Sequence, residues 1–167
     1  MNIFDKAFQD VIGFEGGYVN NPNDKGGETK YGISKRSYPN VDIKNLTLDG
    51  AKEIYYKDFW NTIRLELSLI DDEKIAIELF DTAVNMGVGV ASKFLQEALN
   101  LMNRNQKEWN DLIVDGYCGF ETLKAYKKAR KDILLKVLNG LQFCRYKSIV
   151  EKNPTQEVFF NGWMKRV

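Results

Sequence analysis

The chain has 167 residues, of which 44% are hydrophobic and 28% charged, and its 24 Lys and Arg nearly balance 23 Asp and Glu. This size fits one domain of roughly 100 to 200 residues, and the composition is typical of a soluble globular protein. The absence of histidine excludes Ser-His-Asp and Cys-His catalysis and leaves a zinc site without its usual imidazole ligands. Hydrolysis by this chain would therefore be carried out by carboxylates, without a metal or an organic cofactor.

The sequence carries no targeting or membrane signal that we recognise. No run approaches the roughly 20 apolar residues that span a bilayer, and the first residues lack the basic and apolar regions of a signal peptide. We therefore expect synthesis in the cytoplasm and no stable membrane insertion. Cys118 and Cys144 are too few for a disulfide framework, so buried reduced thiols are expected.

Apolar residues at the spacing of an amphipathic helix open the chain: Phe4, Ala7, Phe8, Val11 and Ile12. Asn2 fits the N-cap position, and Gly16 with Gly17 is expected to end the helix. Glu15 falls on the same stripe in the last turn, where burial and the partial charge of the helix end would raise its pKa. On periodicity alone, an ordinary salt-bridged glutamate is the simpler interpretation.

The segment from Tyr18 to Tyr31 is rich in Asn, Pro, Asp and Gly, which predicts a small β-hairpin or an ordered loop. Further helices are predicted from a Thr47 cap to Trp60, from Asp72 to Met86, from about Val90 to Met102, from about Gly119 to Arg130 and from Asp132 to Lys152. Gly87 is expected to stop the second of these helices, Pro154 the last, and Thr155 to cap one more short helix. The pattern predicts a mainly α-helical protein with one small β or irregular lobe after the first helix.

Two polar residues follow Glu15 in the turn-rich segment. Gly16-Gly17 and Gly26-Gly27 permit sharp turns, so the chain between them is expected to fold back and place Asp24 and Thr29 beside the helix end. Glycoside hydrolysis needs a protonated acid on one side of the scissile bond and a second group that activates water or attacks on the other. Glu15 is therefore a candidate general acid, with Asp24 and Thr29 as its candidate partners.

The segment EGGYVNNPNDKGGETKYGIS, residues 15–34, resembles the signature of the glycoside hydrolase family 108 N-acetylmuramidases in the lysozyme-like superfamily. The likeness continues through DTAVNMG (residues 81–87), through Asp115-Gly116 and into the closing FNGW segment, and so covers nearly the whole chain. It implies a single lysozyme-like domain over residues 1–167. Residues 1–100 would be the catalytic part, and about 101–167 a helical part resembling a predicted peptidoglycan-binding region. It also implies Glu15 as the catalytic acid.

A weaker likeness is to phage-type lysozymes. There a glutamate at the end of the first helix is followed by an aspartate and then a threonine that position water in a small β-lobe. Glu15, Asp24 and Thr29 stand in the same order, although the spacing to the threonine is one residue shorter here.

Four other residues are candidates for substrate binding. Tyr18 and Tyr31 flank the glycine-rich segment and are placed to stack on sugar rings, although aromatic residues in a small helical domain more often belong to the core. Asp81 and Asn85 lie four apart on one helix face, and such a polar pair either finds partners in the core or lines a cleft. Structural hydrogen bonding and substrate contact are equally good interpretations of that pair.

The sequence therefore predicts a muramidase that cuts the glycan strands of bacterial peptidoglycan at the cell wall, after release by a holin or a dedicated export route. One alternative is a catalytically inactive peptidoglycan-binding or secretion-accessory protein, because some relatives of the family are named secretion activators. A second is a nucleic-acid binder that uses the basic run from Lys124 to Lys131, but the net charge of +1 disfavours it and a solvated helix face is the simpler interpretation. The sequence gives no signal for an oligomeric state.

Overall fold

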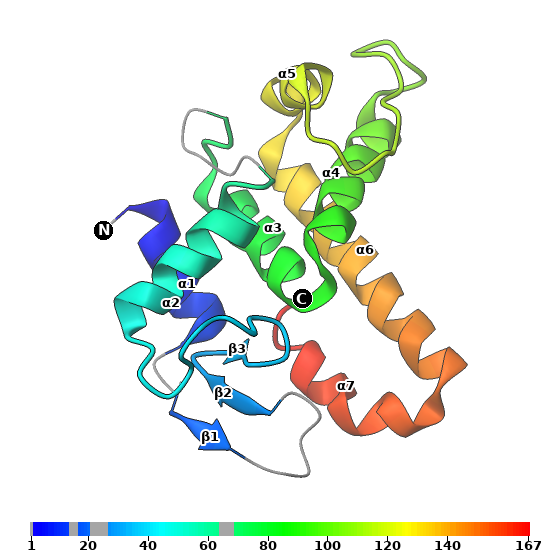
Figure 1. The fold of residues 1–167 in the computed structure, drawn as a ribbon. Helices are drawn as coiled ribbons and strands as arrows, with labels where there is room; N and C mark the ends of the chain where they lie inside the picture. Colours follow the sequence, from blue (N-terminus) through cyan, green and yellow to red (C-terminus); the bar gives the residue numbers. More distant parts are fainter. Residues whose placement is uncertain (1, 14–16, 21–26, 64–68) are drawn as a thin grey trace.

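The computed structural model describes residues 2–13, 17–20, 27–63 and 69–167 (Figure 1). Within these ranges the elements in chain order are α1 (Ile3–Ile12), β1 (Val19–Asn20), β2 (Glu28–Lys30), β3 (Ile33–Ser34), α2 (Leu48–Tyr55), α3 (Glu73–Met86), α4 (Val88–Met102), α5 (Phe120–Lys128), α6 (Lys131–Lys152) and α7 (Glu157–Trp163). A π-helical turn, Tyr56–Trp60, extends α2, and a 3₁₀ turn, Pro154–Gln156, precedes α7. The prediction of a mainly α-helical protein with a small β element after the first helix is confirmed.

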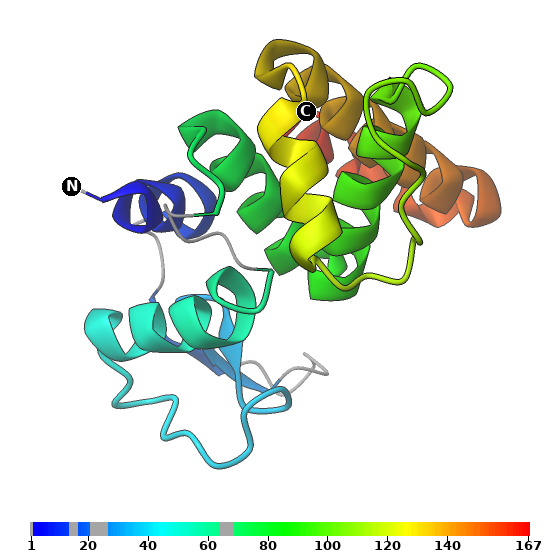
Figure 2. The same ribbon diagram turned by 90° about the horizontal axis from the view of Figure 1, so that it is seen from above.

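Helix α3 is the centre of the fold. It packs against α1 on one side and against α4 and α6 on the other. Figure 2 shows α1, α2 and the sheet on one side of α3, with α4, α5 and α6 on its other side. Among the described residues, no helix is long and apolar enough to cross a membrane.

An aromatic cluster joins the first helices to α3. The fully buried ring of Phe80 makes edge-on contacts with Phe4, Tyr55 and Trp60 at centroid distances of 5.9, 6.2 and 5.6 Å. Edge-to-face aromatic pairs at such distances are favourable beyond the area that they bury. The cluster therefore fixes how α1 and α2 sit on the central helix.

The small sheet is antiparallel, with strand order β1-β2-β3. Tyr31 and Gly32 form the two-residue turn between β2 and β3 with φ angles of 51° and 75°, which is the geometry that hairpin turns of this length favour. A Cβ atom at Gly32 would lie 2.5 Å from the Tyr55 hydroxyl, so glycine is required there for space as well. The predicted hairpin is present, and the structure adds β3 beyond it.

Most of the predicted helix signals are confirmed. Asn2, Thr47 and Asp72 each accept a hydrogen bond from a backbone N–H three residues later. Gly87 follows the end of α3 with a φ of 99°. The Thr155 cap is wrong: Thr155 lies inside the 3₁₀ turn, and Asn153 accepts from its N–H, because an asparagine before Pro154 is the better N-cap.

Candidate active site and the Asp81 cluster

The two predicted catalytic carboxylates, Glu15 and Asp24, lie outside the described residues. Helix α1 ends at Ile12 and not at Gly16-Gly17 as predicted. Gly13 takes a φ of 67° and its N–H donates to the Gln9 carbonyl, which closes the last turn. Helix α1 therefore ends before Glu15, and the raised pKa of Glu15 stays a prediction.

Thr29 occupies the centre of the sheet. It pairs with Val19 on β1 and with Ser34 on β3, and its side chain is half-buried. Its hydroxyl donates to the Gly27 carbonyl over a long 3.4 Å. Since a bond of this length is weak, the hydroxyl is held only loosely by its own backbone.

The two tyrosines have different surroundings. Tyr18 is 37% exposed, and its hydroxyl donates to the Glu28 carboxylate at 2.8 Å, which raises the pKa of the Tyr18 phenol. Tyr31 is a half-buried turn residue whose carbonyl accepts from the Tyr55 hydroxyl at 3.1 Å. Tyr18 thus presents an exposed ring beside the sheet, whereas Tyr31 has an evident structural role in the turn.

Asp81 lies at the centre of a group of polar side chains that we call the Asp81 cluster: Glu78, Asp81, Thr82, Asn85, Gln142 and Arg166. The buried Asp81 carboxylate forms an ion pair with Arg166 and accepts from Gln142 Nε2 and Asn85 Nδ2, each at 3.1 Å. Burial raises the pKa of Asp81, and the Arg166 guanidinium opposes that shift. The cluster joins α3, α6 and the end of the chain through hydrogen bonds in the core.

Asp81 and Asn85 were predicted to form a buried polar pair, but the side chain of Asn85 is exposed. Its amide nitrogen donates back to the carbonyl of Asp81 at 2.8 Å as well as to the carboxylate. Asp81 is therefore engaged in hydrogen bonds within the protein, and Asn85 lies on its solvent side. A role of either residue in substrate contact stays a prediction.

Glu78 is a member of the cluster that the sequence did not reveal. It is 7% exposed, and Thr82 donates to it at 3.4 Å. Burial and, to a smaller extent, the neighbouring Asp81 carboxylate raise the pKa of Glu78 to about 7. Its spacing of three residues from Asp81 was the available signal, because two acidic residues on one face of an apolar helix must interact.

A cavity of about 390 Å³ opens next to the cluster and is lined by Asp10, Val11, Ile77, Glu78, Asp81, Gly162, Lys165 and Arg166. Its walls come from the last turn of α1, the middle of α3 and the end of the chain. One wall of the cavity is therefore the last turn of α1, which directly precedes the segment that contains Glu15. A carboxyl group whose pKa is raised toward neutral pH, as that of Glu78 is, is also the type of group that proton transfer requires.

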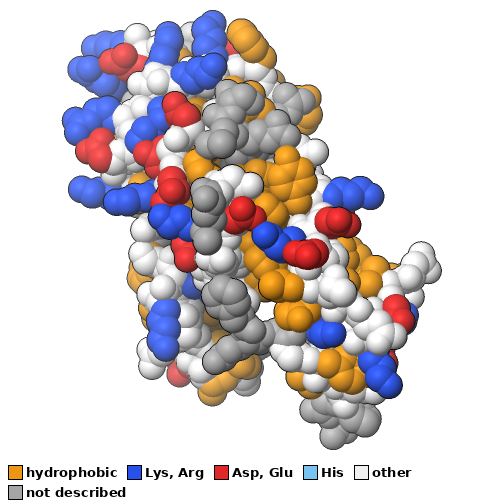
Figure 3. All heavy atoms as spheres, turned by 90° about the vertical axis from the view of Figure 1, so that its left-hand side faces the viewer, with side chains coloured by type: hydrophobic (Ala, Val, Ile, Leu, Met, Phe, Trp, Pro, Cys, Tyr) orange, Lys and Arg blue, Asp and Glu red, His pale blue; other side chains and the backbone are white. Residues whose placement is uncertain are grey.

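The basic run from Lys124 to Lys131 is largely engaged within the protein. The Lys128 and Lys131 ammonium groups donate to backbone carbonyls, and Arg130 pairs with Asp132 at 2.8 Å. On the face in Figure 3, the Lys and Arg side chains over the upper part are interspersed with Asp and Glu. The pattern is that of a solvated surface with local ion pairs.

Comparison with known protein families accounts for nearly all of the chain. Residues 8–87 match the family described as Glycosyl hydrolase 108, and residues 90–167 match the family described as Predicted Peptidoglycan domain. The first segment of the chain is thus similar to the glycosyl hydrolase 108 family, and the second is similar to the predicted peptidoglycan domain. A comparison with curated proteins found no match.

Among solved structures, the chain is similar to SagA from Brucella abortus, with a TM-score of 0.70 and 26% sequence identity. The similarity covers 98% of this chain and 88% of the SagA chain, and it fits the predicted lysozyme-like fold. The helices and the sheet described above thus belong to one shared architecture that spans both family segments.

Proposed function

We propose that the protein is a peptidoglycan N-acetylmuramidase, which hydrolyses the β-1,4 bond between N-acetylmuramic acid and N-acetylglucosamine. The observation that carries the proposal is the glycosyl hydrolase 108 match over residues 8–87, which includes Glu15. The following match to a predicted peptidoglycan domain supports the choice of substrate. The site of action would then be the cell wall, reached through a holin or an export apparatus.

In this proposal Glu15 protonates the leaving sugar oxygen. Asp24 and Thr29 orient the attacking water or stabilise the positive charge that develops on the sugar ring in the transition state. The long hydrogen bond of the Thr29 hydroxyl supports its role, because a loosely held hydroxyl can turn toward a water molecule. Tyr18 would contact the sugar rings through its exposed ring, and Asn85 through its exposed amide.

The first prediction concerns Glu15→Gln, which removes the transferable proton but keeps the shape of the side chain. We expect lysis of purified wall to fall by about a thousandfold, as measured by turbidity, with an unchanged circular dichroism spectrum. Glu73→Gln, at an exposed glutamate paired with Lys6, is the matched control and should lyse like the wild type. Mass spectrometry of the released fragments should show N-acetylmuramic acid at the reducing ends.

The competing function is that of an inactive peptidoglycan-binding or secretion-accessory protein. It would bind insoluble wall in a pull-down without reducing turbidity, and Glu15→Gln would then change neither measurement. Fragments with N-acetylglucosamine at the reducing end would show that the other glycosidic bond is cut. Fragments that end in an anhydro sugar would show that the bond is cut without hydrolysis.

A further inference from the structure

An irregular loop, residues 109–119, is fixed along α4 by side-chain amides. Asn100 holds both backbone groups of Leu112: its Nδ2 donates to the carbonyl at 2.8 Å, and its Oδ1 accepts from the N–H at 2.7 Å. One turn earlier, the buried Gln96 accepts from the Gly116 N–H at 2.8 Å and donates to the Tyr117 carbonyl at 3.0 Å. The loop is therefore held at two points by the kind of bonds that a neighbouring strand would otherwise supply.

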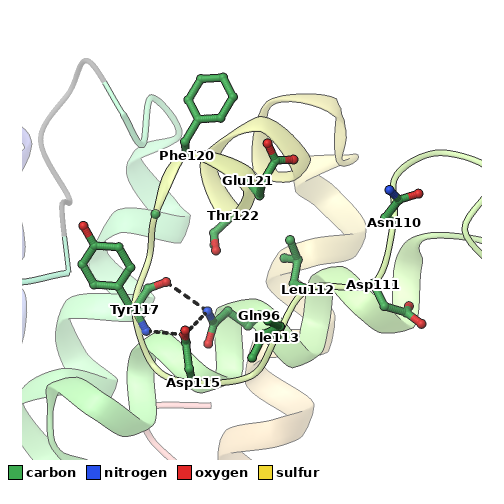
Figure 4. A pocket seen from close by; sticks show the side chains of 11 residues that line it. Gln96, Asn110, Asp111, Leu112, Ile113, Asp115, Tyr117, Phe120, Glu121 and Thr122 are labelled. Carbon is green, nitrogen blue, oxygen red and sulfur yellow. Dashed lines mark hydrogen bonds between the residues drawn. The ribbon is translucent and has the colours of Figure 1, made fainter.

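A cavity of about 490 Å³ lies between this loop and the beginning of α5. Figure 4 shows the side chains of Leu112 and Thr122 directed toward its middle, with Gln96 behind them. The rings of Tyr117 and Phe120 project outward from one edge of the same cavity. We call this cavity with its aromatic edge the loop pocket.

Three large apolar side chains of the loop pocket are exposed to solvent: Ile113 by 80%, Tyr117 by 63% and Phe120 by 75%. Exposed apolar side chains add little to stability, and in a mobile loop they would collapse onto the nearest apolar surface. Here the amides of α4 hold the backbone that carries Ile113 and Tyr117. Apolar groups grouped on an ordered loop beside a cavity are typical of a binding surface.

The acidic side chains of the loop pocket favour some classes of ligand over others. Its lining contains the carboxylates Asp111, Asp115 and Glu121, and the lining residues that the structure describes include no Lys or Arg. Anionic polymers are repelled by such a lining. Carboxylates instead accept hydrogen bonds from hydroxyl and amide N–H groups, while aromatic rings pack against the apolar faces of a ligand. Sugars with N-acetyl groups combine these features.

We propose that the loop pocket is a binding subsite for the N-acetylated sugars of a glycan strand. It would hold one sugar ring in the cavity between Leu112 and Thr122 and the adjoining sugar against Tyr117 and Phe120. Glu121 accepts hydrogen bonds from the sugar hydroxyl and amide groups at the rim. The choice of a wall glycan rests on the proposed function, and the subsite assigns that binding to particular residues of the predicted peptidoglycan domain.

The test uses the full chain with Glu15→Gln, so that no bond is cut, and the tetramer of N-acetylglucosamine as the probe. Titration followed by NMR should shift the backbone amides of residues 110–122, and a dissociation constant is read from these amides. Adding Phe120→Ala or Tyr117→Ala should weaken that constant by about tenfold, since a buried aromatic anchor commonly contributes this much. Phe159→Ala, at a 54% exposed phenylalanine on α7, is the matched control and should bind with unchanged affinity.

Two results would overturn the subsite. One is a tetramer that leaves the amides of residues 110–122 unshifted or binds equally well after Phe120→Ala. The other is a shift of these amides by isolated stem peptides but not by glycan. Lysis by the wild-type chain is measured separately, so its loss would refute the proposed muramidase activity without affecting the binding result, and the reverse also holds.

Discussion

The Asp81 cluster and the loop pocket both contain buried or half-buried side-chain amides, but these amides bind different groups. The amide of Gln142 in the cluster binds other side chains, and the amides at the loop pocket bind the backbone. In the cluster, Gln142 is fully buried and its amide donates to Asp81 and Thr82, so polar groups bind one another inside the core. In the loop pocket, Gln96 and Asn100 bind backbone groups and leave apolar rings facing solvent. The first arrangement connects polar groups within the core, whereas the second holds exposed apolar side chains in place at the surface.

The largest effect expected from this comparison is on stability, from Asp81→Ala. The change removes the anionic partner of Arg166 and one of the two acceptors of Gln142, and we expect the free energy of unfolding to fall by about 3 to 4 kcal/mol in urea titrations. Glu73→Ala on the same helix removes the exposed ion pair with Lys6 and should cost less than about 1 kcal/mol. Equal losses for the two variants would show that the cluster does not stabilise the fold.

A slightly smaller effect is expected from pH. The pKa of Glu78 is raised from 4.5 to about 7, so the folded protein holds this proton more tightly than the unfolded chain does. The stabilising contribution of this proton is therefore fully present below about pH 4.5 and is lost as the pH rises through about 7, which changes the unfolding free energy by roughly 3 kcal/mol. Glu78→Gln should remove that slope in urea titrations between these pH values. Parallel pH profiles for wild type and variant would contradict the assigned proton.

The smallest change in stability is expected at the loop pocket, from Asn100→Ala. The loss of two hydrogen bonds to Leu112 should cost about 1 to 2 kcal/mol. The sharper readout is hydrogen exchange, which should accelerate at the Leu112 amide and in its neighbours while α3 and α6 stay protected. Glu97→Ala, on the same helix, is the control. Exchange that is unchanged in the loop would mean that the amides of α4 do not hold it.

Local signals in the sequence were sufficient for most of the fold. Caps such as Thr47 and Asp72 and the stop at Gly87 depend on neighbours a few residues away, so their patterns are visible in the sequence. The predicted end of α1 at Gly16-Gly17 is wrong, because the helix ends at Ile12. Gly13 alone was enough, since a single residue with positive φ closes a helix.

The candidate site was less predictable, because its partners are distant in the chain. Asp81 was chosen as a polar residue on an apolar helix, but nothing near it indicates Gln142 or Arg166, which are 61 and 85 residues away. Glu78 appears in the sequence as one more helical glutamate. Its burial follows from how α6 and the end of the chain cover α3, which periodicity does not encode. The roles of Glu15, Asp24 and Thr29 stay predictions from the family resemblance.

The ion pair between Asp81 and Arg166 also has a consequence for folding during synthesis. Asp81 is synthesised 85 residues before Arg166, so its carboxylate on α3 has no cationic partner from this ion pair until the segment with Arg166 has been made. Packing of α3 against α6 before that moment would bury a charge without its partner, which is costly. The packing around Asp81 is therefore complete only once α6 and the segment that carries Arg166 have both been made.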